Sequence, residues 1–214
     1  MPFVKICGLR RPEDADYVNA AGADFAGFVF AKGRRRISVE EAAVLRRRLS
    51  GDIVSVGVFV NERPEIIAEA VSAGVIGAVQ LHGQETAEYV AGLRKLLEQR
   101  SVGGRIPVIQ AFCIGDREDL EAALQSEADF LLLDRGAGGT GKSFDWSLIE
   151  GEKRPDRPFF LAGGLGPGNI EEAVRRIRPF GVDMSSGVET DGFKDGEKIA
   201  RVMRAIRALR GSCG

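Results

Sequence analysis

The sequence predicts an α/β fold, a single (β/α)8 TIM barrel in which eight parallel strands form one closed sheet surrounded by outer helices. Short apolar runs alternate with segments of helical periodicity, which is the order typical of βαβ units. The strands recur at a regular spacing, with no linker or low-complexity segment between them. The first strand-to-helix loop, Cys7-Gly8-Leu9-Arg10, lacks the G-x-G-x-x-G pattern of open dinucleotide-binding sheets. These observations favour one barrel domain over residues 1–214.

The first four strand–helix units follow one another directly from the N-terminus. Each strand is a short run rich in β-branched and aromatic residues. The segment after it places apolar residues at helical spacing and charged residues on the outer face. In chain order, the expected pairs are strand 3–7 with helix 11–21, strand 25–30 with helix 39–49, strand 54–60 with helix 64–73, and strand 78–81 with helix 86–99.

The last four units repeat this pattern with one exception. After the sixth strand a glycine-rich segment leads only to a short turn at 147–150, so we expect the sixth helix to be short. The other segments again combine an apolar run with an amphipathic stretch. The expected elements are strand 107–112 with helix 118–125, strand 130–134, strand 159–162 with helix 167–177, and strand 182–185 with helix 195–209.

Composition narrows the kind of partner. The chain has 214 residues, of which 44% are hydrophobic, and it carries 30 basic and 31 acidic residues. This near-zero net charge does not favour nucleic acid or an anionic membrane, so we expect a small-molecule partner. No apolar run approaches the ~20 residues of a membrane span, and the N-terminus has no signal-peptide pattern. Three widely spaced cysteines give neither a disulfide framework nor a zinc site, which fits a reducing cytoplasm and no metal.

Two adjacent loops after the seventh and eighth strands are suited to an anion. In a barrel of this kind, functional groups gather at the carboxyl ends of the strands. Glycine lets backbone N–H groups approach a phosphate, and a nearby helix N-terminus adds positive potential. The alternative is that these glycines serve tight turns only. The expected phosphate-binding residues are Gly163, Gly164, Ser185, Ser186 and Gly187.

A third glycine-rich run, Gly138-Gly139-Thr140-Gly141-Lys142, does not have the full spacing of a nucleotide P-loop. Its position after the sixth strand suits a loop that covers a substrate, with Lys142 available to an anion. An exposed loop without function is the alternative.

Cys7 ends the first strand and is a candidate reactive thiol. Strand alternation puts Lys5 on the same face one layer below it, and Asp183 on the neighbouring eighth strand is a plausible partner for that lysine. A nearby ammonium would favour the thiolate. Inert packing is the alternative for Cys7. Cys113 also lies near a strand end but has no such cationic neighbour in sequence, and Cys213 lies in a C-terminal tail that we expect to be frayed, so we interpret both as incidental.

Asp134 lies at the top of a buried apolar strand, where a carboxyl group suits a general acid, although it could instead cap a loop. His82 is the only histidine and also follows a strand end, where it could contact a substrate or only the backbone. The run Lys32-Gly33-Arg34-Arg35-Arg36 could hold a carboxylate or phosphate, because arginine binds such groups through two hydrogen bonds; it could also be a solvated surface run.

At these residues the sequence resembles phosphoribosylanthranilate isomerase, an enzyme family of tryptophan biosynthesis, over essentially its whole length. Each shared motif is weak alone, but their order is specific. The motifs are Lys5-Ile6-Cys7-Gly8-Leu9, Gly27-Phe28-Val29-Phe30, Val56-Gly57-Val58-Phe59-Val60-Asn61, Gln80-Leu81-His82-Gly83, the run 138–142 before Phe144-Asp145-Trp146, Leu161-Ala162-Gly163-Gly164-Leu165, and Asp183-Met184-Ser185-Ser186-Gly187-Val188-Glu189.

The resemblance implies a cofactor-free Amadori rearrangement of N-(5'-phosphoribosyl)anthranilate to 1-(o-carboxyphenylamino)-1-deoxyribulose 5-phosphate. It implies that Asp134 is the general acid and Cys7, as thiolate, the base. Arg35, or alternatively Arg36, would hold the anthranilate carboxylate. Asp183 would contact the substrate amine or set the environment of Cys7. The resemblance leaves the role of His82 and the choice between monomer and homodimer open.

Two other functions compete with this one. A related sugar-phosphate isomerase of histidine synthesis has a similar fold and chemistry, but it typically has paired aspartates where Cys7 stands. A barrel that binds phosphate without catalysis is the second alternative. The presence of both Cys7 and Asp134 favours the isomerase over that alternative.

Overall fold

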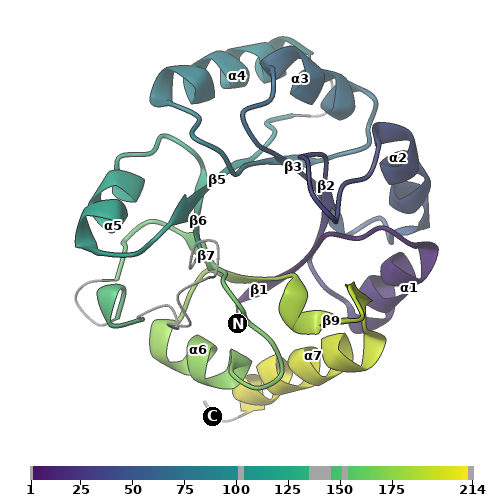
Figure 1. Cartoon of the computed structure of the whole chain (residues 1–214), viewed down its shortest axis with the longest axis vertical. Coiled ribbons are helices and arrows are strands. Elements are labelled where there is room, and N and C mark those ends of the chain that lie inside the picture. Colours follow the sequence, from purple (N-terminus) through teal and green to yellow (C-terminus); the bar gives the residue numbers. More distant parts are fainter. Residues whose placement is uncertain (1, 101–103, 135–145, 151–153, 212–214) are drawn as a thin grey trace.

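The computed structural model is a closed barrel of eight parallel strands in the order β1 to β8, with β1 paired to both β2 and β8. It describes residues 2–100, 104–134, 146–150 and 154–211. Helices surround the strands, as Figure 1 shows. The (β/α)8 fold expected from the sequence is therefore confirmed.

The elements follow the expected order. The strands are β1 Phe3–Cys7, β2 Phe25–Val29, β3 Val54–Phe59, β4 Ala78–Leu81, β5 Val108–Cys113, β6 Phe130–Asp134, β7 Phe159–Leu161 and β8 Gly181–Met184. The helices are α1 Pro12–Ala21, α2 Val39–Arg48, α3 Pro64–Ser72, α4 Ala87–Arg100, α5 Arg117–Leu124, α6 Ile170–Ile177 and α7 Gly196–Gly211, with short 3-10 helices η1 Trp146–Leu148 and η3 Ser186–Val188. In the described part between β6 and β7, the single turn η1 is the only helical element, which agrees with the expectation of a short sixth helix.

The largest boundary difference affects the helix after β7. The sequence predicts its start at residue 167, but α6 begins at Ile170. The Asn169 side chain accepts a hydrogen bond from the N–H of Gly166 at 2.9 Å, and the Gly166 carbonyl accepts from the N–H groups of Asn169 and Ile170. This side-chain-closed turn delays the helix by three residues. Elsewhere the ends of strands and helices differ from the predicted ones by one or two residues.

A two-stranded antiparallel hairpin between β8 and α7 is absent from the sequence prediction. Its strands are β9 Glu189–Thr190 and β10 Phe193–Lys194. Asp191 and Gly192 between them have φ angles of 51° and 79°. Positive φ at both central residues is the mark of a tight hairpin turn, and Asp-Gly is a preferred dipeptide for it.

Two apolar layers stabilise the barrel. The larger one fills the space between the sheet and the helices. The smaller one fills the barrel interior, where the inward-facing residues are Val56, Ala78, Ile109, Ala111, Leu132, Phe160 and Ala162. Toward the amino ends of the strands, Phe160 packs on the rings of Phe25, Phe130 and Phe180, with ring centroids 5.5 to 5.9 Å apart. The interior is thus filled below, and its carboxyl end is left for polar groups.

Candidate active site

A cavity of about 620 Å³ opens at the carboxyl end of the barrel. It brings together all the site residues expected from the sequence except Gly187. Its walls also include Gln80 and the basic segment after β2. The expected residues that line it are Cys7, Arg35, His82, Asp134, Gly163, Gly164, Asp183, Ser185 and Ser186.

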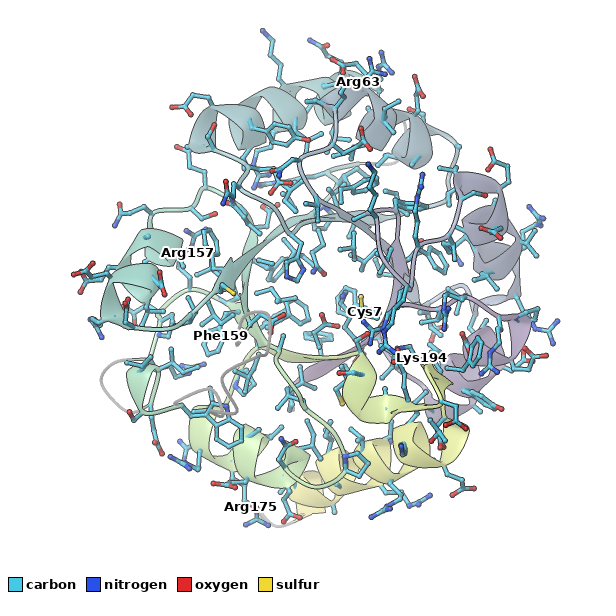
Figure 2. The ribbon with its side chains drawn as sticks, viewed as in Figure 1. Cys7, Arg63, Arg157, Phe159, Arg175 and Lys194 are labelled. Atoms are coloured by element: carbon cyan, nitrogen blue, oxygen red, sulfur yellow. The ribbon has the colours of Figure 1, made fainter. Side chains whose placement is uncertain are left out.

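Cys7 lines this cavity from the end of β1 (Figure 2). Lys5 is fully buried two residues earlier on the same strand. The Nζ atom of Lys5 lies 3.0 Å from Oδ1 of Asp183 on β8. The two residues pair directly in the register of β1 and β8. The sequence-based expectation of a lysine–aspartate pair beneath the cysteine is therefore met in the structure. Gly27 on β2 leaves room for the thiol, because a Cβ there would lie 2.7 Å from Sγ of Cys7.

Burial raises the pKa of the Cys7 thiol above its ordinary value of 9.0. The ammonium groups of Lys5 and Lys194 lower that pKa, and the carboxylate of Asp183 raises it. The lysine therefore favours the thiolate, as expected, but loss of solvent outweighs it. Burial therefore holds the pKa of Cys7 above its ordinary value, and Lys5 and Lys194 offset this effect in part.

Asp134 reaches the cavity from β6, three strands away from β1 around the barrel. Its Oδ2 atom lies 3.8 Å from Nε2 of His82, and 28% of its side chain is exposed. The Nδ1 atom of His82 lies 3.0 Å from Nε2 of Gln80, whose amide is buried and whose Oε1 has no hydrogen-bond partner among the described residues. An amide, an imidazole and a carboxyl group thus stand in a row along one wall.

Of the three consecutive arginines, Arg34 and Arg35 line the cavity and Arg36 does not. Arg36 is exposed and pairs through its backbone with Val29 at the end of β2. Arg35 is largely buried, and its Nε and Nη2 atoms donate to Oε1 and Oε2 of Glu189 at 2.7 and 2.9 Å. Of the two alternatives that the sequence leaves open, Arg35 is thus the one that lines the cavity.

The loops after β7 and β8 meet at the cavity. Gly163 and Gly164 have φ angles of 88° and 73°, a conformation that other residues rarely adopt. Ser185 and Ser186 line the cavity beside them. Gly187 lies just behind: a Cβ there would stand 2.0 Å from the carbonyl oxygen of Leu165. Gly187 thus lets the two loops approach each other and does not itself line the cavity.

The sequence alone predicts no functional role for Lys194, Glu189 or Gln80. Lys194 lies on β10 and is fully buried, with its Nζ atom 2.7 Å from Oε1 of Glu189 and 3.1 Å from the carbonyl oxygen of Ser185. The Asp-Gly turn was the available signal for the hairpin that carries Lys194. For Gln80 the signal was strand alternation, which places it on the same face as His82.

Other candidate features lie elsewhere. The run 138–142, with Lys142, and Cys213 fall outside the described residues. Cys113 is exposed at the end of β5. The described residues contain no group of three or more acidic, histidine or cysteine side chains arranged for a metal. None of the helices in that part of the chain is long and apolar enough to cross a membrane.

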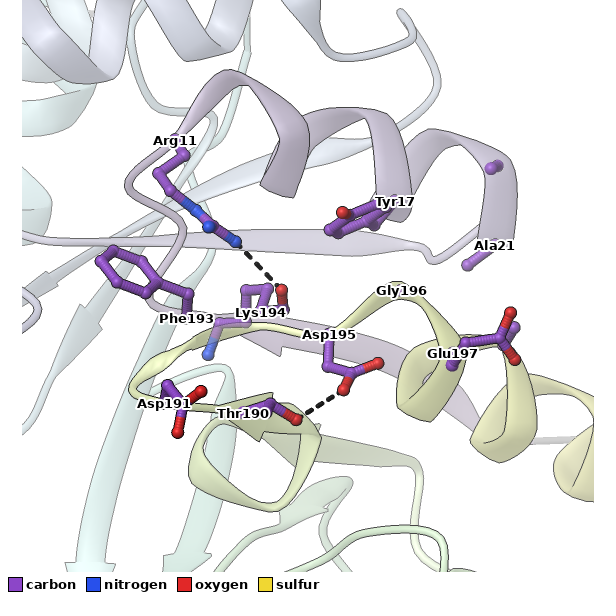
Figure 3. A pocket seen from close by; sticks show the side chains of 12 residues that line it. Arg11, Tyr17, Ala21, Thr190, Asp191, Phe193, Lys194, Asp195, Gly196 and Glu197 are labelled. Carbon is purple, nitrogen blue, oxygen red and sulfur yellow. Dashed lines mark hydrogen bonds between the residues drawn. The ribbon is translucent and has the colours of Figure 1, made fainter.

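A second hollow, of about 700 Å³, lies between α1, the hairpin and the start of α7 (Figure 3). It contains none of the site residues predicted from the sequence. Three acidic residues line it: Asp191 lies in the hairpin turn, Asp195 precedes α7 and accepts from the N–H of Lys198, and Glu197 lies in the first turn of α7. The cavity at the barrel mouth, which Cys7 and Asp134 line, is therefore the candidate active site.

Comparison with known proteins identifies close relatives. A family model described as N-(5'-phosphoribosyl)anthranilate (PRA) isomerase matches residues 4–205. The N-(5'-phosphoribosyl)anthranilate isomerase of Acetivibrio thermocellus is 47% identical over 99% of this chain and 98% of its own.

Solved structures similar to this chain come from the same family. The crystal structure of phosphoribosyl anthranilate isomerase from Thermotoga maritima covers 98% of this chain and 100% of its own, with 41% identity and a TM-score of 0.84. Another crystal structure of a phosphoribosyl anthranilate isomerase, with 40% identity and a TM-score of 0.83 over 98% of this chain and 100% of its own, contains reduced 1-(o-carboxyphenylamino)-1-deoxyribulose 5-phosphate.

Proposed function

The chain belongs to the family of N-(5'-phosphoribosyl)anthranilate isomerases, and we propose that Cys7 and Asp134 are the groups with which it moves protons in this reaction. The enzyme is an isomerase of tryptophan biosynthesis that converts N-(5'-phosphoribosyl)anthranilate to 1-(o-carboxyphenylamino)-1-deoxyribulose 5-phosphate. The reaction opens the sugar ring at C1' and forms a ketone at C2', so it needs one proton donor and one proton acceptor.

In the proposed mechanism, Asp134 gives a proton to the ring oxygen, and the bond between C1' and that oxygen breaks to leave a Schiff base. The Cys7 thiolate then removes the proton from C2', which gives an enolamine that tautomerises to the ketone. Both residues act on the same sugar from different strands. The observation that carries this proposal is that Cys7 and Asp134 line one cavity, from β1 and β6.

The ends of the substrate have matching groups. We assign the phosphate to the loops that contain Gly163, Gly164, Ser185 and Ser186, with Gly187 holding those loops together. Backbone N–H groups in such glycine-containing loops suit an anion. We assign the anthranilate carboxylate to Arg35. Its guanidinium has five N–H donors, and two of them donate hydrogen bonds to Glu189.

Two further residues support the chemistry. Asp183 holds Lys5 at 3.0 Å, and Lys5 in turn lowers the pKa of Cys7, so we propose that Asp183 sets the environment of the base. His82 lies 3.8 Å from Asp134, and we propose that it contacts the substrate beside the acid. We propose that the enzyme acts on a small phosphorylated molecule in the cytoplasm and uses no cofactor or metal.

The test follows the loss of anthranilate-type fluorescence when freshly made N-(5'-phosphoribosyl)anthranilate is mixed with the purified protein. Replacing Cys7 with Ala or Asp134 with Asn should lower kcat about 10²- to 10⁴-fold, because each removes a proton-transfer group. Binding of the reduced product analogue should persist in both variants. Cys113→Ala, which changes an exposed cysteine, is the matched control and should keep full activity. Unchanged kcat in either active-site variant would refute the assigned roles.

A further inference from the structure

Glu189 is a buried carboxylate that binds three cations. Its Oε1 atom lies 2.7 Å from Nζ of Lys194 and 2.7 Å from Nε of Arg35. Its Oε2 atom accepts from Nη2 of Arg34 at 2.7 Å and from Nη2 of Arg35 at 2.9 Å. Only 5% of the Glu189 side chain is exposed. A carboxylate with so many charge-assisted hydrogen bonds has a fixed position, and it fixes what it binds.

Arg35 is the partner that Glu189 orients. The two hydrogen bonds to Glu189 use Nε and one N–H of Nη2, so the other face of the guanidinium retains donors. The stem of Arg35 lies over Gly8, the residue after Cys7: a Cβ at Gly8 would come within 2.6 Å of Cδ of Arg35. Glu189 on one side and the bare Gly8 backbone below therefore hold this guanidinium at the wall of the cavity, next to Cys7.

Lys194 fixes Glu189 from the other side. It comes from the hairpin strand β10, and its Nζ atom donates to Glu189, to the carbonyl of Ser185 at 3.1 Å and to Oγ of Ser185 at 3.4 Å. Ser185 in turn donates to the carbonyl of Cys7 at 3.0 Å. One chain of contacts thus joins the basic segment, the loop after β8 and the end of β1.

The hairpin that carries Lys194 is itself anchored. Arg11 at the start of α1 donates to the backbone carbonyl of Lys194 at 3.1 Å, and Thr190 donates to Asp195 at 2.5 Å, as Figure 3 shows. The guanidinium of Arg11 also lies over the ring of Phe193, 4.2 Å from its centroid. The hairpin is therefore tied to the start of α1 and to the residue before α7, so Lys194 reaches Glu189 from a fixed point.

We propose that Glu189, held by Lys194, is a positioning residue that orients Arg35 for the carboxylate of the substrate. This inference rests on the proposed function, in which Arg35 binds that carboxylate. Glu189 does not touch the substrate in this arrangement; it acts through the guanidinium. Its replacement should therefore weaken recognition of the carboxylate and leave recognition of the phosphate and the sugar in place.

The experiment measures binding of two ligands by isothermal titration calorimetry: the reduced product analogue and the same molecule without its aromatic carboxylate. Their affinity ratio reports carboxylate recognition alone. Arg35→Ala should remove most of the preference for the carboxylate. Glu189→Gln keeps the shape but removes the charge, and it should reduce the ratio about tenfold. In the double variant the ratio should equal that of Arg35→Ala, since both act through one contact.

Glu150→Gln is the matched control. Glu150 also binds an arginine through two hydrogen bonds, to Nε and Nη2 of Arg176, but it lies outside the cavity. It should leave the affinity ratio unchanged. Should Glu189→Gln fail to fold, Glu189→Asp keeps the charge but cannot reach Arg35 and Lys194 together, and it should give an intermediate ratio.

The possible results distinguish a failure of the proposed role of Arg35 from a failure of the positioning role of Glu189. If the wild-type protein does not prefer the carboxylate-bearing ligand, or Arg35→Ala keeps that preference, the role of Arg35 fails. If Arg35→Ala loses the preference but the folded Glu189 variant binds both ligands as the wild type does, only the positioning role fails. Tighter binding of the carboxylate ligand by Glu189→Gln would also overturn the inference, because it would mean that Glu189 competes for Arg35.

Discussion

Cys7 must lose its proton before it can act as a base, and its surroundings oppose that loss. Burial raises the pKa of the thiol above 9.0, while Lys5 and Lys194 lower it in part. Since the charged form of a thiol is the thiolate, burial favours the protonated thiol. The same burial shields the sulfur from alkylation and oxidation.

This resting state can be measured directly. In a chain with Cys113→Ser and Cys213→Ser, the rate at which iodoacetamide alkylates Cys7 should rise with pH through a midpoint above 9.0, because only the thiolate reacts. The same chain unfolded in urea supplies the ordinary thiol midpoint as a control. A folded-state midpoint at or below the unfolded one would show that the two lysines outweigh burial.

At the scale of elements, the sequence predicts the barrel well and the hairpin not at all. Eight apolar runs identify eight strands, because each is buried and bounded by polar or glycine residues. The strands β9 and β10 have two residues each, so they offer no periodicity. Lys194 lies on β10, so the sequence does not predict that this cation binds Glu189. Contacts between segments far apart in sequence, such as Arg35 with Glu189, leave no local pattern.

The crossing of the loops after β7 and β8 gives an element-scale prediction. A Cβ at Gly187 would lie 2.0 Å from the carbonyl oxygen of Leu165, so Gly187→Ala must push the two loops apart. We expect KM for the phosphorylated substrate to rise at least about tenfold with a smaller change in kcat, because displaced loops weaken phosphate binding.

Gly168→Ala is the control for this prediction. Gly168 lies in the connection between β7 and α6, the one that Gly187 approaches, but a Cβ at Gly168 would meet nothing within 4 Å. Its KM should equal that of the wild type. A Gly187→Ala protein with unchanged KM would mean that the phosphate is held elsewhere than in these two loops.

At the scale of the whole molecule, the two ends of the barrel have different compositions. The carboxyl end contains the polar cavity, which could be located from the sequence because the fold places strand ends there. Which basic residue faces inward could not be located in this way, since Arg34, Arg35 and Arg36 are equivalent in composition and differ only in how the chain turns after β2. The interior below the cavity is filled by aromatic rings.

This division predicts that stability and substrate binding can be changed separately. Phe160 is fully buried and packs on Phe25, Phe130 and Phe180. Phe160→Ala should lower the free energy of unfolding by about 3 to 5 kcal/mol, because the barrel closed by β1 and β8 cannot collapse into the cavity that is left. KM should change less than about threefold, since the polar groups at the carboxyl end lie above this layer.

Urea denaturation and steady-state kinetics on one protein preparation measure both quantities. Val44→Ala removes methyl groups from an exposed side chain of α2 and should change the free energy of unfolding by no more than about 0.5 kcal/mol. If Phe160→Ala raised KM as strongly as it lowered stability, the aromatic layer would be part of the binding site, and the two ends of the barrel would be coupled through its interior.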